Sequence, residues 1–263
     1  MIERFSYSSL SSYQKCPAQF KFRYVDWIRK PDESIEAFMG KRVHETIEYL
    51  YTEVLRGKIP LLDPLLDWYS ACWTNQWHDR IGIVKRNVSI QEYFQLGQQC
   101  IARYYRMYAP FDQPVVENEL ELVFPLDADR DYMMKGVIDR LDHLGDGYYE
   151  IHDYKTGSRA MTSQQADKDG QLALYHYALL QTKEPVKGVQ LVWHFLRHGV
   201  TVTSTRTKGQ LSKLVKQMKG RIDEIREKIQ KRGSFNPKQS VLCNWCYYWE
   251  ECPTKRGTNP FVG

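Results

Sequence analysis

The stretch GVIDRLDHLGDGYYEIHDYKTG, residues 136–157, decides the fold that this sequence predicts. Apolar and polar residues alternate through it, and the sequence Gly-Asp-Gly at residues 145–147 interrupts the alternation. Alternation of this kind is typical of a half-buried strand, and a glycine-rich interruption is typical of a tight turn. We therefore predict two strands, residues 132–144 and 148–154, joined as a hairpin.

This hairpin carries two carboxylates and a lysine. Asp139 and Asp153 lie on its adjacent strands, close enough to converge on one cation. Facing carboxylates repel each other unless a divalent metal neutralises them. Lys155 follows Asp153 by two residues, so both side chains point to the same face of the strand. A lysine beside a carboxylate-bound metal can help to deprotonate a water or balance charge on a phosphate. Each residue alone would equally suit an ordinary salt bridge at a strand end.

Outward from the hairpin, the apolar pattern changes from helical to strand-like near residue 115. The predicted helices cover residues 8–20, 38–57, 61–80, 89–108, 171–180 and 206–232, and the further strands cover 117–126, 186–196 and 200–205. This order favours an α/β fold with a mixed central sheet flanked by helices. We expect one domain over residues 1–263, with a helical part (1–114), an α/β core (115–232) and a cysteine-rich tail (233–263).

The composition is that of a globular protein. Of the 263 residues, 42% are hydrophobic and 26% are charged, with 16 Gly and 11 Pro, which excludes collagen-like, mucin-like and disordered classes. No apolar run approaches the roughly 18–20 residues that span a bilayer. The first residues, MIERFSYSSLSSYQKCP, lack the apolar core of a signal peptide. We expect a soluble, cytoplasmic protein that contacts no membrane.

Positive charge is concentrated near the C-terminal end. The net charge is +5, and residues 206–232 contain ten Lys or Arg against three acidic residues. A concentrated basic element favours a polyanionic partner, most often a nucleic acid, although a charged helix face is more commonly just solvated. If the chain acts on DNA, we expect the predicted helix over residues 206–232 to bind the DNA strand.

Four short motifs follow one another along the chain. The hairpin supplies G-x-[IV]-D-R at residues 136–140 and D-Y-K-T-G at 153–157, and predicted helices supply G-x-x-x-H at 40–44 and Q-x-x-x-Y at 171–175. In type, order and spacing these motifs resemble the RecB-like branch of the PD-(D/E)XK nuclease superfamily. The resemblance spans most of the chain and implies a restriction-endonuclease-like fold. It also implies cleavage of DNA that depends on Mg²⁺ or Mn²⁺.

The same resemblance implies roles for individual residues. The metal ligands that it implies are His44, Asp139, Asp153 and the carbonyl of Tyr154. Lys155 would be the catalytic lysine, and Gln171 and Tyr175, on one helix face, would shape the site and touch DNA. His44 taken alone would be interpreted as a structural histidine, and its surroundings lack the second histidine of a zinc-protease motif.

Three of the six cysteines cluster in the tail. Cys243, Cys246 and Cys252 have the spacing of metal ligands, and Cys16 lies near the other end of the chain. In a cytosolic chain a C-x-x-C pair is more often a metal or redox site than a disulfide, and no thioredoxin-like unit is evident here. The spacing alone leaves two occupants open, Zn²⁺ and a [4Fe–4S] cluster, because both accept four thiolates.

The N-terminal segment, residues 6–20, reads S-x-S-x-L-x-x-Y-x-x-C-P-x-x-F. It resembles the corresponding segment of Fe–S nucleases related to the bacterial AddB subunit and to CRISPR-associated exonucleases. This resemblance implies that four cysteines hold a [4Fe–4S] cluster, namely Cys16, Cys243, Cys246 and Cys252. Such a cluster would join the two ends of the domain and close a very long loop, so we expect it to be structural.

Aromatic and basic residues alternate around and after this motif. The aromatic residues are Phe20, Phe22, Tyr24 and Trp27, and the basic residues are Lys21, Arg23 and Arg29. Rings near cations can stack single-stranded bases while the charges follow the phosphates. The alternative, which we favour at this stage, is that the rings pack around the cluster.

Together these features predict a metal-dependent DNA nuclease. We expect an exonuclease that acts on single strands or DNA ends rather than an endonuclease, with a role in repair, recombination or CRISPR adaptation. The chain has no G-x₄-G-K-[ST] motif, so a helicase motor would be a partner chain; a homo-oligomer is also compatible. One alternative is a non-catalytic DNA-binding module, against which the intact set of Asp139, Asp153 and Lys155 argues. Another is a zinc-binding accessory protein.

Overall fold

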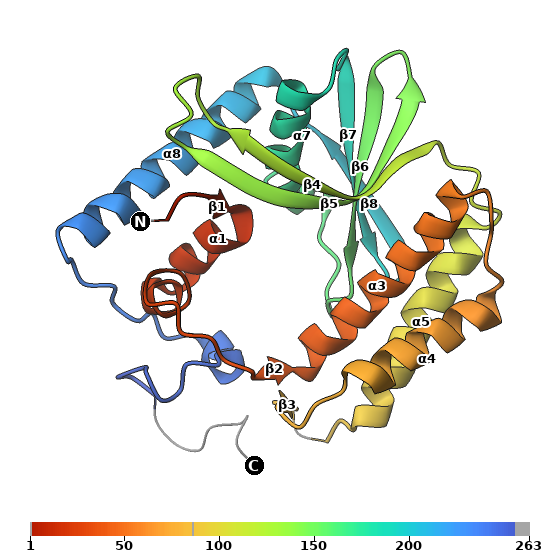
Figure 1. Cartoon of the computed structure of the whole chain (residues 1–263), viewed down its shortest axis with the longest axis horizontal. Helices are drawn as coiled ribbons and strands as arrows, with labels where there is room; N and C mark the ends of the chain where they lie inside the picture. The colour runs from red at the N-terminus through yellow and green to blue at the C-terminus, as the bar shows by residue number, and fades with distance from the viewer. Residues whose placement is uncertain (1, 86, 256–263) are drawn as a thin grey trace.

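The computed structural model describes residues 2–85 and 87–255, and a six-stranded mixed sheet forms its centre (Figure 1). Its strands are β1 (Phe5–Ser6), β4 (Val115–Pro125), β5 (Met133–Gly145), β6 (Tyr148–Lys155), β7 (Gly188–Phe195) and β8 (Val200–Thr205). The sheet order is β1-β5-β6-β7-β8, with β4 paired to β5. The predicted hairpin is the antiparallel β5–β6 pair, whereas β6 and β7 run parallel.

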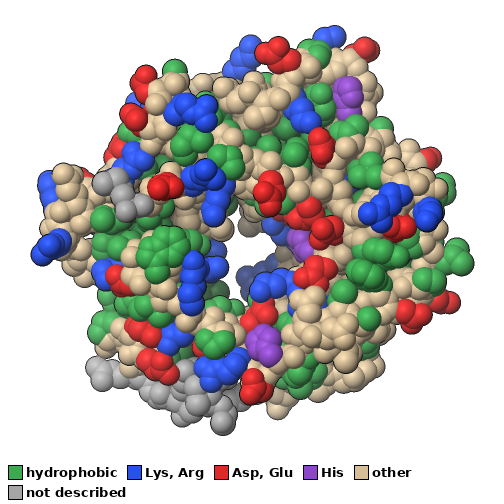
Figure 2. Space-filling view, viewed as in Figure 1, with side chains coloured by type: hydrophobic (Ala, Val, Ile, Leu, Met, Phe, Trp, Pro, Cys, Tyr) green, Lys and Arg blue, Asp and Glu red, His purple; other side chains and the backbone are tan. Residues whose placement is uncertain are grey.

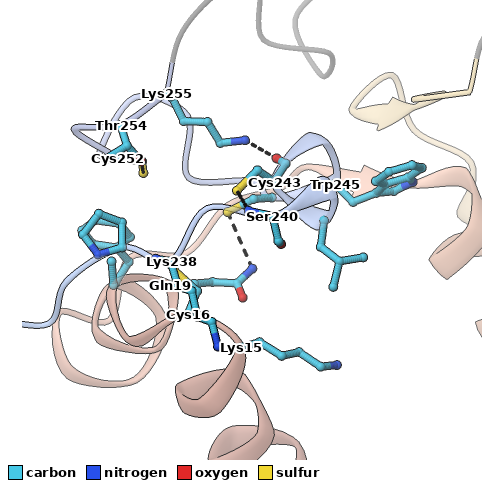
Figure 3. A pocket seen from close by; sticks show the side chains of 15 residues that line it. Lys15, Cys16, Gln19, Lys238, Ser240, Cys243, Trp245, Cys252, Thr254 and Lys255 are labelled. Atoms are coloured by element: carbon cyan, nitrogen blue, oxygen red, sulfur yellow. Dashed lines mark hydrogen bonds between the residues drawn. The ribbon is translucent and has the colours of Figure 1, made fainter.

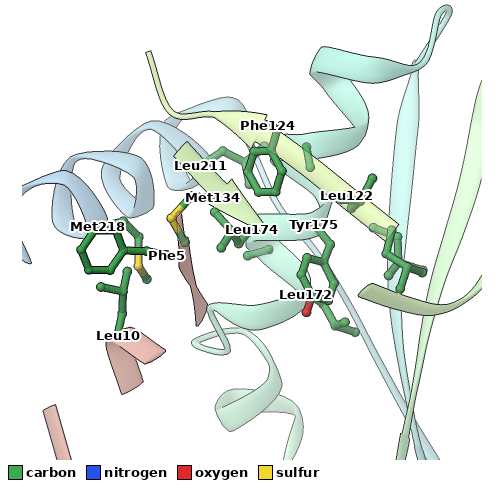
Figure 4. Close-up of a cluster of buried hydrophobic side chains, with 14 of the residues drawn as sticks. Phe5, Leu10, Leu122, Phe124, Met134, Leu172, Leu174, Tyr175, Leu211 and Met218 are labelled. Carbon is green, nitrogen blue, oxygen red and sulfur yellow. The ribbon is translucent and has the colours of Figure 1, made fainter. Parts of the chain in front are cut away.

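Helices cover both faces of the sheet. They are α1 (Tyr7–Lys15), α2 (Pro17–Phe20), α3 (Ile35–Leu55), α4 (Leu62–Gln76), α5 (Ile90–Tyr108), α6 (Ser163–Ala166), α7 (Gln171–Thr182) and α8 (Lys208–Gln230). One buried cluster joins the sheet to α1, α7 and α8, and includes Met134, Leu174 and Met218 (Figure 4). A second joins α3, α4 and α5 to Tyr154 and Leu196 on the other face. The predicted fold, a mixed central sheet flanked by helices, is confirmed.

Strand β6 presents alternate side chains to these two clusters. Ile151 belongs to the cluster with α7 and α8, and Tyr154 belongs to the cluster with α3 and α5. Because side chains alternate along a strand, Asp153 and Lys155 share the face of Ile151. They therefore point toward α7, where Gln171 is the first helical residue.

The N-terminal helix differs from the prediction at one point. The sequence predicted one helix over residues 8–20, but α1 ends at Lys15 and α2 begins at Pro17. Proline has no N–H to donate and restricts the residue before it, so Cys16 is extended (φ −156°, ψ 105°) between the two helices. The break leaves the Cys16 sulfur beside the C-terminal tail, where the Lys238 N–H donates to it at 3.4 Å.

The N-terminal segment runs from the sheet to the tail before it enters α3. At its start β1 pairs with β5, with Phe5 opposite Met134. Beyond the π-helical turn η1 (Lys21–Val25), Lys30 Nζ lies 2.6 Å from Glu250 and 2.7 Å from Glu251 of the tail. The described part of the tail contains the short 3-10 turn η2 (Val241–Trp245). After its contacts with the tail, the N-terminal segment forms β2 (Glu33–Ser34), which pairs with β3 (Ile81–Gly82).

An opening is visible in the middle of the molecule in the same view (Figure 2). The sheet, α3, the tail and the N-terminal segment with α1 surround it (Figure 1). Lys and Arg side chains gather along the left edge of the opening, and Asp, Glu and His side chains gather along the right edge, whose lower part also carries Lys or Arg (Figure 2). Within residues 2–85 and 87–255, no helix has both the length and the apolar character needed to cross a bilayer.

Candidate active site

The β5–β6 hairpin brings Asp139 next to the backbone of Tyr154. The recorded pairing of the two strands ends with Arg140 opposite His152. Beyond this pair, the Tyr154 N–H of β6 donates to the side chain of Asp139 in β5, with 2.8 Å between the nitrogen and Oδ2. This side-chain bond continues the contact between the two strands. This bond holds the Asp139 carboxylate beside the peptide unit that joins Asp153 to Tyr154.

Helix α3 brings His44 to the same place. His44 Nε2 lies 2.8 Å from the Tyr154 carbonyl oxygen, and Nδ1 lies 3.5 Å from Asp139 Oδ2. Gly40 eases the close approach, since a Cβ there would lie only 3.0 Å from Thr156 Oγ1, just after β6. The G-x-x-x-H motif therefore has a geometric reason: its glycine lets the helix reach the strand, and its histidine meets the carbonyl.

Glu119 of β4 completes this group, and sequence analysis did not identify it. One ligand atom from each of His44, Glu119 and Asp139 lies within 4.8 Å of the other two. Burial, followed by the carboxylates of Asp139 and Glu48, raises the pKa of Glu119 to about 8. Its φ of 51° lies in the left-handed region, where non-glycine residues are uncommon and cluster at functional sites.

A partial sequence signal for Glu119 exists. Glu117, Glu119 and Glu121 occupy alternate positions of β4, which indicates a shared face of the strand. The neighbours of Glu119 pair with the neighbours of Asp139 in β5, so the register places these two carboxylates opposite each other. Alternation cannot select the middle glutamate of the three, because the choice depends on strand register.

The buried Asp153 and the partly exposed Lys155 form an ion pair beside this group. Lys155 Nζ lies 2.6 Å from Oδ2 and 2.8 Å from Oδ1 of Asp153. Burial raises the pKa of Asp153, and the charge of Lys155 offsets part of the increase. Burial disfavours the charged form of Lys155, but attraction to Asp153 outweighs it and raises the pKa of the lysine. Lys155 is therefore held in its protonated form.

Helix α7 places Gln171 and Tyr175 next to Lys155. Lys155 Nζ donates to Gln171 Oε1 at 3.4 Å, and Gln171 Nε2 donates to the Tyr175 hydroxyl at 3.5 Å. The Asp169 carboxylate accepts the Gln171 N–H at 2.9 Å and so caps the start of the helix. The structure thus links the lysine to the helix through a chain of side-chain hydrogen bonds.

Gly136 has no room for a side chain, because a Cβ there would overlap the Tyr175 ring. We expect Gly136→Ala to displace Tyr175, to destabilise the protein by about 1–3 kcal/mol as overpacking does, and to slow DNA cleavage. Urea denaturation and initial cleavage rates measure both effects. Gly220→Ala is the matched control: no atom lies within 4 Å of its Cβ position. Since Gly220 is inside α8, this change should stabilise the protein by roughly 0.5–1 kcal/mol. Equal stability of the two variants would contradict the packing argument.

The donor set fits a hard divalent cation. The carboxylates of Glu119 and Asp139 and the Tyr154 carbonyl are oxygen ligands of the kind that Mg²⁺ and Mn²⁺ prefer, and the His44 imidazole is a nitrogen donor that suits Mn²⁺ better than Mg²⁺. In the part of the chain that the structure describes, no Lys or Arg forms an ion pair with Glu119 or Asp139. The raised pKa of Glu119 keeps one of these two adjacent carboxyl groups protonated near neutral pH, and a bound divalent cation would allow both to ionise.

A buried polar network lies behind the site, on the side of α3 and α5. Arg140, 1% exposed, donates to Asp142 Oδ2 at 2.9 Å and to the Tyr104 hydroxyl at 2.8 Å. The Tyr104 and Tyr154 hydroxyl oxygens lie 3.3 Å apart, so the Tyr154 side chain is anchored here while its backbone faces Asp139. One ligand atom from each of Asp142, Glu150 and His152 lies within 4.8 Å of the other two. Arg140 pairs with Asp142 and already supplies positive charge there, so this group does not need a metal ion to balance its charge. Tyr104 and Asp142 belong to none of the sequence motifs and were not predicted.

The four predicted cysteine ligands line one cavity of about 220 Å³ between the N-terminal segment and the tail (Figure 3). They are Cys16, Cys243, Cys246 and Cys252, and none of them forms a disulfide. The N–H groups of Lys238 and Ser240 each donate to a cysteine sulfur at 3.4 Å, and the Gln19 amide donates to a third at 3.6 Å. Hydrogen bonds to sulfur are typical of thiolates that ligate a metal or a cluster.

Two of the seven basic side chains on α8 form ion pairs with acidic side chains of the described chain. Lys219 lies 3.0 Å from Asp127, and Lys228 lies 3.3 Å from Glu224. The apolar face of the helix is buried and includes Leu211, Met218, Ile222 and Ile225. Among the described residues, the basic side chains of α8 with no recorded ion pair include Lys208, Lys213 and Lys216. DNA binding by this helix stays a prediction and depends on those side chains.

Comparison with known proteins identifies a family and a solved structure of similar fold. The family model of the PD-(D/E)XK nuclease superfamily matches residues 4–253. The crystal structure of a Eubacterium rectale protein, provisionally described as an exonuclease, has a TM-score of 0.56 at 10% identity, covering 97% of this chain and 91% of that chain. A crystal structure of SSO0001 has a TM-score of 0.39 at 13% identity, covering 95% of this chain and 96% of that one, too low to support an argument. No curated protein matches the chain.

Proposed function

The chain belongs to the PD-(D/E)XK nuclease superfamily, and from this premise we propose that it is a Mg²⁺- or Mn²⁺-dependent deoxyribonuclease. We propose that it acts as an exonuclease on single-stranded DNA or DNA ends. The observation that carries the proposal is the convergence of His44, Glu119 and Asp139 beside the Asp153–Lys155 pair. The fold shared with the Eubacterium rectale protein is consistent with it.

In the proposed reaction, water attacks the phosphorus and the phosphodiester P–O bond breaks. His44, Glu119, Asp139 and the Tyr154 carbonyl would hold the metal ion, with Asp153 as a further ligand once it turns from Lys155. A metal bound there polarises the phosphate and lowers the pKa of a water. The Lys155 ammonium balances the negative charge that develops on the phosphate. Gln171 and Tyr175 keep this ammonium in place.

We further infer that Cys16, Cys243, Cys246 and Cys252 hold a [4Fe–4S] cluster and not Zn²⁺. Zn–S bonds of ~2.3 Å in a tetrahedral site place the sulfur atoms about 3.8 Å apart. Over the described residues, which include all four cysteines, no three cysteine sulfurs lie within 4.8 Å of one another. This wider spacing supports a larger occupant. The cluster would join both ends of what we propose is one nuclease domain.

The resemblance to Fe–S nucleases of the RecB-like branch supports a role in repair, recombination or CRISPR adaptation. In such a role the chain would act with a helicase or another recombination or CRISPR protein, or as a homo-oligomer. The residues that carry this part of the proposal are the cysteine set and the N-terminal segment around Cys16.

The proposal is tested with end-labelled single- and double-stranded DNA in Mg²⁺, Mn²⁺ or EDTA. We expect metal-dependent cleavage that EDTA abolishes, and a ladder of products that shortens progressively from one end. A covalently closed single-stranded circle of the same sequence should resist cleavage if the enzyme requires an end. Cleavage that persists in EDTA, or no cleavage by folded protein that carries its cluster, would contradict the proposal.

A further inference from the structure

A second hollow lies next to the candidate active site, and the proposed reaction does not use it. It has a volume of about 450 Å³ and lies between η1, the segment after it, α3 and the tail. Its basic lining residues are Arg23, Arg29, Lys30 and Lys41, and Tyr247 and Tyr248 of the tail add aromatic rings. These segments frame the opening on the side away from the sheet (Figures 1 and 2).

Helix α3 connects this hollow to the candidate active site. Ala37 and Lys41 line the hollow, and His44 lies three residues beyond Lys41, on the same side of the helix. With a rise of 1.5 Å per residue, Ala37 and His44 are about 10 Å apart along the helix axis. A polymer bound at His44 would therefore reach the hollow within a short length of its backbone.

Two positive charges in the hollow lack a carboxylate partner. Lys30 and Lys41 are paired, Lys30 with Glu250 at 2.6 Å and Lys41 with Glu33 at 2.5 Å. For Arg23 and Arg29 the described part of the chain offers no ion pair, and both side chains belong to exposed residues. The hollow therefore has two guanidinium groups available for anionic groups such as phosphates.

Trp27 stands beside these charges and is unusual in two ways. It is 60% exposed, whereas Phe20 of the same segment is fully buried. Its φ of 57° lies in the left-handed region, which is an outlier for a bulky side chain. The Arg29 guanidinium lies 5.2 Å from the centre of the Trp27 ring, which leaves the ring beside a cation. Of the rings in this segment, Phe22 lines the cysteine cavity, Phe20 packs in the core against Tyr13 and Phe235, and Trp27 is exposed.

We propose that Trp27, Arg23 and Arg29 form a docking site for single-stranded DNA, separate from the metal ligands. The two guanidinium groups bind successive phosphates, and the Trp27 ring stacks on an unpaired base. Stacking on an exposed ring requires a base that is free of its partner strand, so the site selects single strands over duplex. This inference rests on the proposed function and deepens it, since it specifies that the DNA reaching His44 is single-stranded.

The test measures binding in EDTA, where no cleavage occurs. The probe is a labelled oligothymidylate of about 20 nucleotides, longer than the 4–16 that single-strand sites commonly cover. We expect Arg23→Ala with Arg29→Ala to make the slope of log affinity against log salt shallower by about 1.4, since each phosphate contact contributes about 0.7. Trp27→Ala should weaken binding about 5- to 150-fold, the usual range for loss of one stacked base.

A matched control removes two exposed arginines elsewhere, Arg106 on α5 and Arg130 between β4 and β5. It changes the net charge equally and should leave the salt slope nearly unchanged. If the control and the Arg23, Arg29 variant shift the slope equally, or if Trp27→Ala weakens duplex and single-strand binding alike, the docking site is disproved. Thermal melts of each variant exclude misfolding as the cause of a loss.

The same probe separates this inference from the proposed function. If wild type binds the oligonucleotide through Trp27 but does not cleave it when Mn²⁺ is added, the nuclease proposal fails and the docking site stands. If wild type cleaves the probe and the variants bind and cleave as wild type does, the docking site fails and the nuclease proposal stands.

Discussion

Asp153→Asn is expected to cleave DNA 100-fold or more slowly than wild type, and the protein should still fold. Metal ions and the groups around them typically supply several kcal/mol of transition-state stabilisation, and each 1.36 kcal/mol is about tenfold in rate. Asp153 is 3% exposed and holds the Lys155 ammonium at 2.6 Å. The amide removes the negative charge that both the metal ion and Lys155 require.

The control for this variant is Glu121→Gln, which removes one carboxylate from an exposed position of β4. It should retain the wild-type rate in single-turnover cleavage of end-labelled DNA, and both variants should show cooperative thermal unfolding. Cleavage by Asp153→Asn within a fewfold of wild type would remove Asp153 from the proposed mechanism.

Cys16→Ser is expected to lose the bound iron and a large part of the stability. Cys16 and the three tail cysteines line one cavity, so the cluster would close the loop between the two ends of the chain. In the chain-entropy description, closing a loop of 100 residues or more contributes about 5 kcal/mol. For a protein of this size that corresponds to a decrease in Tm of roughly 10–20 °C.

The control is Cys72→Ser, because Cys72 lies on α4 and does not line the cavity. The measurement is iron and zinc analysis of anaerobically purified protein, together with visible absorbance and thermal melts. Cys72→Ser should retain the iron and the Tm of wild type. A colourless wild type that carries only zinc, or an unchanged Tm for Cys16→Ser, would contradict the cluster.

Local sequence patterns predicted most of the fold because they are set by residues close together in the chain. The Gly-Asp-Gly turn and the alternation on both sides of it are sufficient for the β5–β6 hairpin. The periodic apolar residues of α3, α5 and α8 are likewise local. Strands β1, β2 and β3 have two residues each and were not predicted, since two residues carry no periodicity.

Only those residues of the candidate site that belong to a sequence motif could be predicted. The motifs led to His44, Asp139 and Lys155, which the structure brings to one end of β6. Glu119 was missed because its position opposite Asp139 depends on the register of β4 against β5. Trp27 could not be assigned either, because exposure is a property of the folded chain and its neighbours Phe20 and Phe22 pack against other rings.

The central claim is that His44, Glu119 and Asp139 bind a divalent metal ion. The most direct test compares the equilibrium binding of Mn²⁺ to wild type and to Asp139→Asn, with free Mn²⁺ measured by its electron paramagnetic resonance signal. The variant retains an oxygen that can accept the Tyr154 N–H, so the hairpin should keep its shape. We predict saturable Mn²⁺ uptake by wild type and a large loss of affinity in the variant, because one of the two facing carboxylates is gone. Equal uptake by the two proteins, or none by wild type, would contradict a metal site at His44, Glu119 and Asp139.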